Sequence, residues 1–132
     1  MVLDTSAVLA ILQNERERRA FSEALAAAET RAMSTATFVE SSIVLEARYG
    51  ADAVRDFDLL LSKAQIALVP LDAEQAHLAR QAFRRFGKGR HPASFNLGDC
   101  FAYALARSLG EPLLFKGNDF RRSDVSCHPA SS

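Results

Sequence analysis

Short apolar runs recur along the chain and predict β-strands. Each run is only a few residues long and is bounded by polar or turn-forming residues, as strands in globular domains are. The predicted strands cover residues 1–3, 31–34, 66–70, 113–115 and 125–128, and those at 66–70 and 113–115 are expected to be buried. The pattern therefore indicates a sheet of very short strands.

The longer segments between these runs carry apolar residues at the three- and four-residue spacing of amphipathic helices. The first helix begins at a cap formed by Thr5 or Ser6 and includes apolar positions from Val8 to Leu12. The further predicted helices cover residues 15–29, a segment from a Ser34 or Thr35 cap to Tyr49, residues 53–64, a segment from an Asp72 cap to Phe86, and residues 98–109. Gly50 and Gly110 end two of these helices, and residues 87–96 form a loop.

The alternation of strands and helices predicts the α/β class. Short apolar strands separated by helices favour a parallel sheet covered by helices on both faces. The chain has 132 residues, no internal repeat and no linker, so residues 1–132 are expected to form one domain. In such sheets a ligand binds beyond the carboxyl ends of the strands, so polar residues at those ends are the first candidates for a site.

Three acidic residues lie just after predicted strands or in the first turn of a predicted helix. Asp4 follows the first strand, Asp119 follows the strand at 113–115, and Asp99 lies in the first turn of the helix at 98–109. Each also has a structural interpretation: Asp4 can cap a helix, Asp99 can form a capping box with Asn96, and Asp119 suits a turn. Their shared placement is what favours a common site.

Glu40 is the fourth candidate because of the helix face on which it lies. Its neighbours at helical spacing are Ala36, Ile43, Val44 and Ala47, so this face is expected to point into the core. A carboxylate in apolar surroundings is unfavourable unless a cation or a metal ion compensates its charge. The alternatives are a glutamate at the margin of the apolar face and an ion pair with Arg48.

Four converging carboxylates predict a hard divalent cation. Like charges that close together do not all stay ionised without compensation, and Mg²⁺ or Mn²⁺ prefers oxygen ligands. Cys100 and Cys127 form no metal or redox motif and are expected to be structural thiols. The start of the chain lacks the pattern of a signal peptide and no apolar run is long enough to span a membrane, so a cytoplasmic protein without membrane contact is expected.

Basic residues are clustered although the formal net charge is zero. The candidates for contacts with the phosphates of a nucleic acid are Arg84, Arg85, Lys88, Arg90, Lys116 and Arg121, with Arg122 next to the last of these. The alternative for the first four is a solvated helix end, where cations are favoured by the helix dipole. Phe95 and Phe120 are candidates for stacking on bases or, alternatively, for core packing.

The order and spacing of the candidate residues resemble those of the PIN-domain toxins called VapC, and the resemblance covers essentially the whole chain. The two C-terminal motifs carry most of its specificity. The matching stretches are Asp4-Thr5-Ser6, Glu40, Asn96-Leu97-Gly98-Asp99-Cys100-Phe101-Ala102 and Lys116-Gly117-Asn118-Asp119-Phe120.

This resemblance implies a PIN-like three-layer α/β/α sandwich around a short central parallel sheet. It implies an Mg²⁺ ion, or Mn²⁺ as a substitute, held by Asp4, Glu40, Asp99 and Asp119, with Ser6 and Asn118 as auxiliary residues. It further implies a metal-dependent endoribonuclease, a homodimer, and a cognate VapB-type antitoxin whose C-terminal segment covers the active site.

Three other functions use some of the same residues. A deoxyribonuclease or flap-type nuclease would need the same acids, although the chain has no insertion for a strand-threading arch. A phosphatase with Asp4 as nucleophile usually carries a second acid two residues later, where this chain has Ser6. A non-catalytic binding module is disfavoured because all four acids are present.

Overall fold

The computed structural model describes residues 1–132. It contains four strands, six α-helices and one short 3₁₀-helix. In chain order these are β1 (Val2–Leu3), α1 (Thr5–Leu12), α2 (Arg18–Ala27), β2 (Ala32–Ser34), α3 (Thr35–Tyr49), α4 (Ala51–Lys63), β3 (Ala67–Val69), α5 (Ala73–Phe86), α6 (Leu97–Leu109), β4 (Leu113–Leu114) and η1 (Phe120–Arg122).

The four strands form one parallel sheet in the order β3-β2-β1-β4, so β1 lies in the interior of the sheet. Val2 pairs with Ala32 on one side and with Leu113 on the other. The strands that end nearest one another at the carboxyl edge are therefore β1, β2 and β4. The predicted α/β class with a parallel sheet is confirmed.

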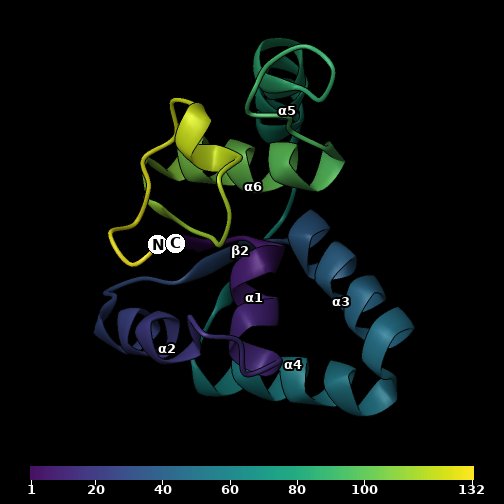
Figure 1. Cartoon of the computed structure of the whole chain (residues 1–132), viewed down its shortest axis with the longest axis vertical. Helices are drawn as coiled ribbons and strands as arrows, with labels where there is room; N and C mark the ends of the chain where they lie inside the picture. Colours follow the sequence, from purple (N-terminus) through teal and green to yellow (C-terminus); the bar gives the residue numbers. More distant parts are fainter.

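Helices cover both faces of this sheet, which gives three layers (Figure 1). One core contains α5, α6 and the C-terminal segment, and the other contains α1 to α4. Successive strand residues alternate between them: Val2 packs in the first core and Leu3 in the second. Both faces of such a short strand must be apolar, which explains why the strand pattern in the sequence is continuous rather than alternating.

Several helix boundaries follow the predicted caps. Ser34 accepts a hydrogen bond from Ala36 N at the start of α3, and Asp72 accepts one from Gln75 N at the start of α5. At the first helix the predicted cap by Thr5 or Ser6 was wrong, whereas the structural interpretation of Asp4 is confirmed: its side chain caps α1. Helix α2 is shorter than the predicted 15–29, because the residues before Arg18 form a turn.

Two strand predictions were wrong in part. Residues 66–70 contain β3, but this strand lies at the sheet edge with Leu68 exposed, and only Ile66 before it is buried. Residues 125–128 form no strand; Cys127 makes a single parallel bridge to Leu113. A strand at the edge of a sheet pairs on one side only and needs only one apolar face. The length and composition of the run at 66–70 therefore did not show that this strand lies at the edge of the sheet.

The remaining predictions for single side chains favour structural roles. Phe95 and Phe120 are buried and pack against each other with ring centroids 5.3 Å apart, so they belong to the core and do not stack on bases. Both cysteines are free, and Cys100 is buried. None of the helices has the length and apolar character needed to span a membrane.

Candidate active site

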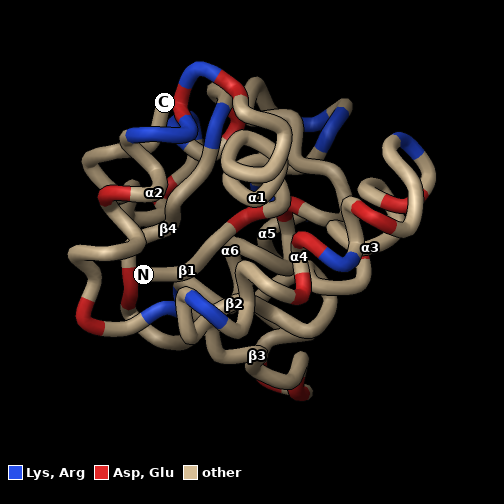
Figure 2. The backbone as a smooth tube through the Cα atoms, turned by 90° about the horizontal axis from the view of Figure 1, so that it is seen from below, with Lys and Arg blue, Asp and Glu red and all other residues tan.

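The acidic candidates lie at the carboxyl edge of the sheet. Asp4 directly follows β1, Asp119 lies in the segment after β4, and Asp99 is in the first turn of α6. Figure 2 shows an acidic position where β1 runs into α1, near the middle of the molecule. The chain therefore brings together acids that are up to 115 residues apart in sequence (119 − 4).

Asp4 is almost completely buried, with 5% of its surface exposed. Its Oδ2 accepts hydrogen bonds from Ser6 N at 3.0 Å and from Ser6 Oγ at 2.6 Å. Burial raises the pKa of Asp4 to about 6 although these hydrogen bonds lower it, and the negative charge of Glu40 raises it further. Asp4 is thus a helix cap and a member of the acidic cluster at the same time.

Asp99 is the member whose ionisation is most strongly opposed. It forms the predicted capping box with Asn96, in which each backbone N–H donates to the other's side chain at 2.9 Å. Burial raises the pKa of Asp99 to about 7, although the backbone hydrogen bond from Asn96 lowers it. The negative charges of Asp4, Asp119 and Glu40 raise the pKa of Asp99 further.

Glu40 reaches this cluster from α3. Its Oε1 accepts a hydrogen bond from the hydroxyl of Thr5, and its Oε2 lies against Gly98. A Cβ atom at position 98 would be only 1.8 Å from Glu40 Oε2, so a side chain there is incompatible with the present position of the carboxylate. Gly98 therefore provides the space for Glu40 next to Asp99.

The sequence predicted that the face of α3 that carries Glu40 points into the core. This prediction was wrong. Val39 and Ile43 are exposed, whereas the buried face of the helix consists of Thr37, Ser41 and Leu45. Val39 and Ile43 thus face solvent on this helix, while two small hydroxyl residues face the interior together with Leu45. Glu40 also forms no ion pair with Arg48, since none of the ion pairs in the structure involves either residue.

Asp119 and Asn118 lie in the exposed segment between β4 and η1. Neither side chain has a hydrogen-bond partner within the protein, and Asp119 does not cap η1 with its side chain. The charge of Asp119 nevertheless acts on Asp99. These two residues form the solvent-facing side of the cluster.

The donor set consists of carboxylate and hydroxyl oxygens, with no thiol or imidazole among the four acids and their hydrogen-bond partners. This chemistry fits a hard divalent cation. No group of three or more acidic, histidine or cysteine side chains in the structure has a geometry that could hold a metal ion. The four acids fit a hard cation by their chemistry, and an ion bound here would take part of its ligands from water, as Mg²⁺ usually does.

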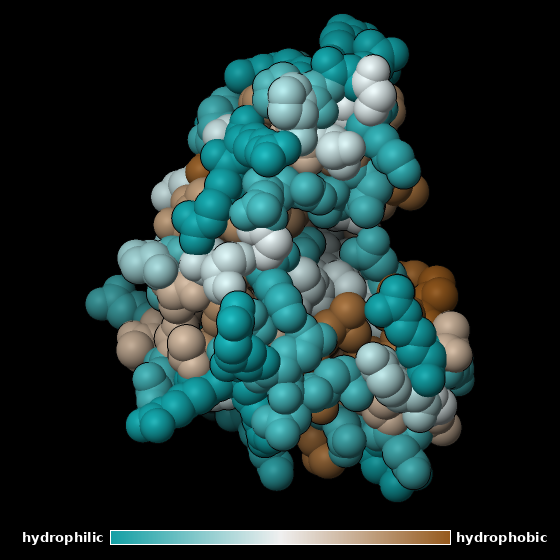
Figure 3. Space-filling view, viewed as in Figure 1, coloured by the Kyte–Doolittle hydropathy of each residue, from teal (hydrophilic) through white to brown (hydrophobic).

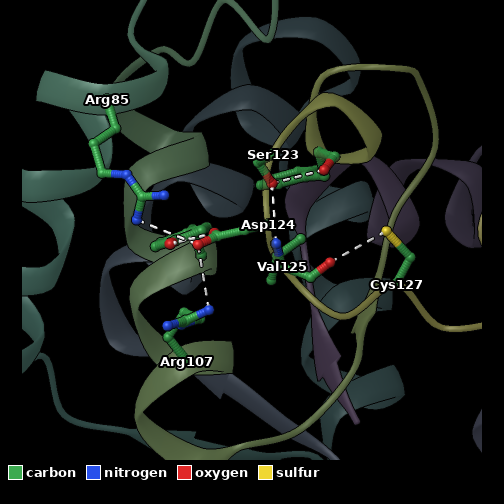
Figure 4. A network of polar contacts seen from close by, with 8 residues as sticks. Arg85, Arg107, Ser123, Asp124, Val125 and Cys127 are labelled. Carbon is green, nitrogen blue, oxygen red and sulfur yellow. Dashed lines mark hydrogen bonds and ion pairs between the residues drawn. The ribbon is translucent and has the colours of Figure 1, made fainter.

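The basic candidates separate into two groups. Arg85 forms an ion pair with Asp124 at 3.2 Å, and Arg107 and Tyr103 contact the same carboxylate (Figure 4). Arg121 donates to the carbonyl of Ser131, Arg122 donates to the carbonyl of Pro92, and Lys116 pairs with two glutamates. Arg84, Lys88 and Arg90 are exposed and form no ion pair. These last three can contact a ligand without breaking an internal ion pair or hydrogen bond, although the guanidinium of Arg90 lies over the ring of Phe83, 5.6 Å from its centroid.

Sequence reasoning did not identify Thr5 and Gly98 as site residues. Thr5 was interpreted as a possible cap, although its buried hydroxyl contacts Glu40 and Ser41 instead. Gly98 was interpreted only as the start of a helix. A glycine inside the first turn of a helix is unfavourable there, and this was the available signal that a close approach requires it.

The fold and this cluster define a class: an α/β domain with an acidic site at the carboxyl edge of a short parallel sheet. The sequence pattern of the PIN domain family matches residues 1–125. A curated relative, "Ribonuclease VapC" of Mycolicibacterium smegmatis, is 52% identical over 126 residues, which are 96% of this chain and 98% of that protein. The chain therefore belongs to the PIN-domain family and, within it, to the VapC ribonucleases.

Solved structures with low sequence identity share the fold. VapC20 of Mycobacterium tuberculosis, described as a sarcin-ricin loop cleaving toxin, has a TM-score of 0.76 at 16% identity, over 94% of this chain and 95% of that chain. A toxin–antitoxin complex from Klebsiella pneumoniae has a TM-score of 0.71 at 18% identity, over 99% of this chain and 98% of that chain. The predicted three-layer PIN-like architecture is confirmed.

Proposed function

We propose that the protein is a metal-dependent endoribonuclease and the toxin of a type II toxin–antitoxin pair in the cytoplasm. The observation that carries this proposal is the placement of Asp99, whose ionisation is opposed by burial and by three further carboxylates. Groups with strongly shifted pKa values at a ligand-facing sheet edge are typical of functional sites. Membership of the VapC ribonucleases makes RNA the expected substrate.

Asp4, Asp99 and Asp119 are proposed to hold Mg²⁺, or Mn²⁺ in its place, directly or through water. When bound, such an ion stabilises negative charge on a phosphate and makes a water molecule more acidic. Glu40 either joins these ligands or orients the attacking water, with the carboxylate directed by Thr5 and Gly98. Ser6 holds Asp4 through two hydrogen bonds, and Asn118 is an exposed amide beside Asp119 that can donate to the substrate.

RNA phosphates are proposed to contact Arg84, Lys88 and Arg90 in the segment that leads to α6. These side chains are exposed and unpaired, and the segment ends at Asn96, which caps the helix that carries Asp99. Arg85, Lys116 and Arg121 belonged to the same prediction, but contacts to RNA would require them to leave the partners described above.

The test is cleavage of mixed cellular RNA by the antitoxin-free protein with Mg²⁺ or Mn²⁺ and with EDTA. We expect cleavage with either ion, complete loss in EDTA, and recovery when excess Mg²⁺ is restored. Cleavage that persists in EDTA would contradict the metal-dependent mechanism. Binding of RNA without cleavage under all conditions would instead favour a non-catalytic module.

A VapB-type antitoxin is proposed to neutralise the enzyme by covering the acidic site with its C-terminal segment. The fold shared with a toxin–antitoxin complex supports such a partner. The four acids lie at a solvent-accessible edge, and Asp119 and Asn118 are exposed, so a peptide laid over this edge would exclude RNA.

A homodimer is proposed through an apolar patch formed by Val39, Ile43, Leu97, Phe83 and Phe101. Ile43 is 62% exposed and Leu97 is 71% exposed, which is unusual for side chains of this size. Figure 3 shows hydrophobic residues exposed at the right-hand edge of the view, over α3. Glu40 and Gly98 line one groove of this patch, so the proposed interface adjoins the acidic site.

Replacement of Ile43 by Asp is expected to make the antitoxin-free protein monomeric. A two-fold dimer places the same patch on both sides of the interface, so the substitution introduces two charges into one apolar contact. Light scattering after size exclusion measures the mass directly. Leu59→Asp on α4, outside the patch and 46% exposed, is the matched control and should remain dimeric. An unchanged dimer for Ile43→Asp would place the interface elsewhere.

A further inference from the structure

A lysine and two glutamates form a charged cluster next to the acidic site. Lys116 Nζ lies 2.7 Å from Glu15 Oε1 and 3.3 Å from Glu17 Oε2. The two glutamates belong to the turn between α1 and α2, about a hundred residues away in sequence. We call these residues the Lys116 cluster. Its net charge is negative, so it is not an obvious place for a phosphate.

Glu17 is the buried member of the cluster. Its side chain is 8% exposed, whereas those of Glu15 and Lys116 are 33% and 39% exposed. Burial raises the pKa of the Glu17 carboxyl, but a hydrogen bond from its own backbone and the positive charge of Lys116 outweigh this effect and leave the pKa below its usual value. Glu17 is therefore ionised at neutral pH. A buried ionised carboxylate needs a cation, and Lys116 is the cation within ion-pair distance that is not fully in solvent.

The turn that carries Glu17 is held in place by backbone hydrogen bonds. Glu15 N donates to Ala10 O in α1, and Glu17 O accepts from Phe21 N in α2. The turn is thus tied to the ends of two packed helices. It offers Lys116 a fixed point of attachment outside the exposed segment between β4 and η1.

The backbone of Lys116 connects this fixed point to the acidic site. Lys116 N donates to Ser6 Oγ at 3.0 Å, and Ser6 Oγ is 2.6 Å from Asp4 Oδ2. Because the Ser6 hydroxyl accepts the backbone N–H of Lys116, its own proton is directed to Asp4. The position of Lys116 therefore determines how the hydroxyl of Ser6 is oriented and how Asp4 is held.

The same lysine also begins the segment that presents Asp119. Two residues separate Lys116 from Asp119 in sequence, and the first of them, Gly117, donates its N–H to the carbonyl of Ser132. Two of the four acids thus depend on where Lys116 lies: Asp4 through the Ser6 hydroxyl and Asp119 through the chain.

We infer that Glu17 and Lys116 are positioning residues of the active site, and that their ion pair holds Ser6, Asp4 and Asp119 in the arrangement that binds the metal ion. This inference rests on the proposed function, since it concerns the same site. It gives the ammonium group of Lys116 a structural partner in place of an RNA phosphate. Outer residues that orient metal ligands typically contribute about 10- to 100-fold to metal affinity or activity.

The experiment compares the full-length, antitoxin-free wild type with Glu17→Gln, Lys116→Met and Lys116→Arg, and with Arg16→Gln as a matched control. Arg16 is 93% exposed and adjacent to Glu17. Four quantities are measured: Mn²⁺ affinity without RNA by calorimetry, kcat and KM for RNA cleavage, and the melting temperature. The substitutions Glu17→Gln and Lys116→Met remove one charge each and leave the backbone donors in place.

We expect Glu17→Gln and Lys116→Met to weaken Mn²⁺ binding by about 10- to 100-fold and to lower kcat by a similar factor, with KM changed by less than about twofold. Lys116→Arg should restore most of the Mn²⁺ affinity, and Arg16→Gln should behave as the wild type. Unchanged Mn²⁺ affinity and kcat would overturn the inference. A rise in KM alone would overturn it too, because it would show that Lys116 contacts RNA.

The Mn²⁺ measurement separates this inference from the proposed function. A wild type that binds Mn²⁺ but cleaves no RNA would count against the ribonuclease proposal, while the affinities of the variants would still decide the role of the ion pair. A wild type that binds no Mn²⁺ would overturn both.

Discussion

Asp99→Asn is expected to reduce RNA cleavage by about a thousandfold or more. A bound divalent ion supplies several kcal/mol of transition-state stabilisation, and every 1.4 kcal/mol corresponds to about a tenfold change in rate. Asparagine keeps the shape of the side chain and an oxygen that can accept the hydrogen bond from Asn96 N, so the capping box of α6 is preserved. The loss of activity should therefore arise from the missing charge and not from unfolding.

The same substitution is expected to stabilise the metal-free protein above neutral pH. The pKa of Asp99 is about 7 in the folded protein against an ordinary value of 3.8, so the folded state binds more protons than the unfolded state between these values. The free energy of unfolding therefore falls as the pH rises from about 4 to 7, and the full penalty is present at pH 8. Asparagine removes a penalty of about 1–2 kcal/mol after allowance for partial exposure, which should raise the melting temperature by several degrees.

The measurement is thermal melting at pH 5 and pH 8, with and without Mg²⁺. The stability gain of Asp99→Asn should be larger at pH 8, and Mg²⁺ should stabilise the wild type but not the variant. Asp58→Asn, at an exposed position on α4, is the control and should change neither activity nor the pH dependence. A variant that is destabilised at pH 8, or that still cleaves RNA, would show that Asp99 is chiefly a structural residue of the helix terminus.

Gly98→Ala is expected to lower activity by about a hundredfold while the fold is kept. The added Cβ would lie 1.8 Å from Glu40 Oε2, so the carboxylate must move and its hydrogen bond with Thr5 must change. A displacement of about 1 Å in a catalytic arrangement can cost about a hundredfold in rate. Alanine is otherwise favourable in a helix, so the melting temperature should not fall strongly.

A double-mutant cycle shows whether Gly98→Ala lowers the activity by displacing the carboxylate of Glu40. If Gly98 acts by giving space to the carboxylate, Gly98→Ala should have little further effect in a Glu40→Ala background. Equal fold-losses in both backgrounds would mean that Gly98 acts on the backbone of α6 and not on Glu40.

The sequence allowed the prediction of those site residues whose position follows from chain topology. Asp4 and Asp119 come after apolar runs that form neighbouring parallel strands, and such strands end at the same edge. Asp99 was predicted from its position in the first turn of a helix, although its capping-box spacing with Asn96 was the structural alternative for the same residue. In each case a local sequence pattern predicts where the residue lies on its strand or helix. The parallel sheet then brings these residues close together in space.

Predictions that depend on contacts between distant segments were less successful. The apolar positions around Glu40 suggested a core-facing helix surface, but α3 buries its hydroxyl residues and exposes Ile43. Periodicity cannot distinguish an apolar face that meets the core from one that is left for a partner. Likewise, nothing near Lys116 in sequence indicated that its ammonium group pairs with Glu15 and Glu17 from the turn after α1.

The most direct test of the central claim, that the four acids form one metal site, is a crystal structure of the antitoxin-free protein soaked in Mn²⁺. We expect an anomalous peak between Asp4, Asp99 and Asp119, about 2.0–2.2 Å from at least one carboxylate oxygen, with water in the remaining positions. The peak should be absent from Asp99→Asn crystals treated in the same way. Manganese bound elsewhere in the wild type, or a full-strength peak in the variant, would contradict the account.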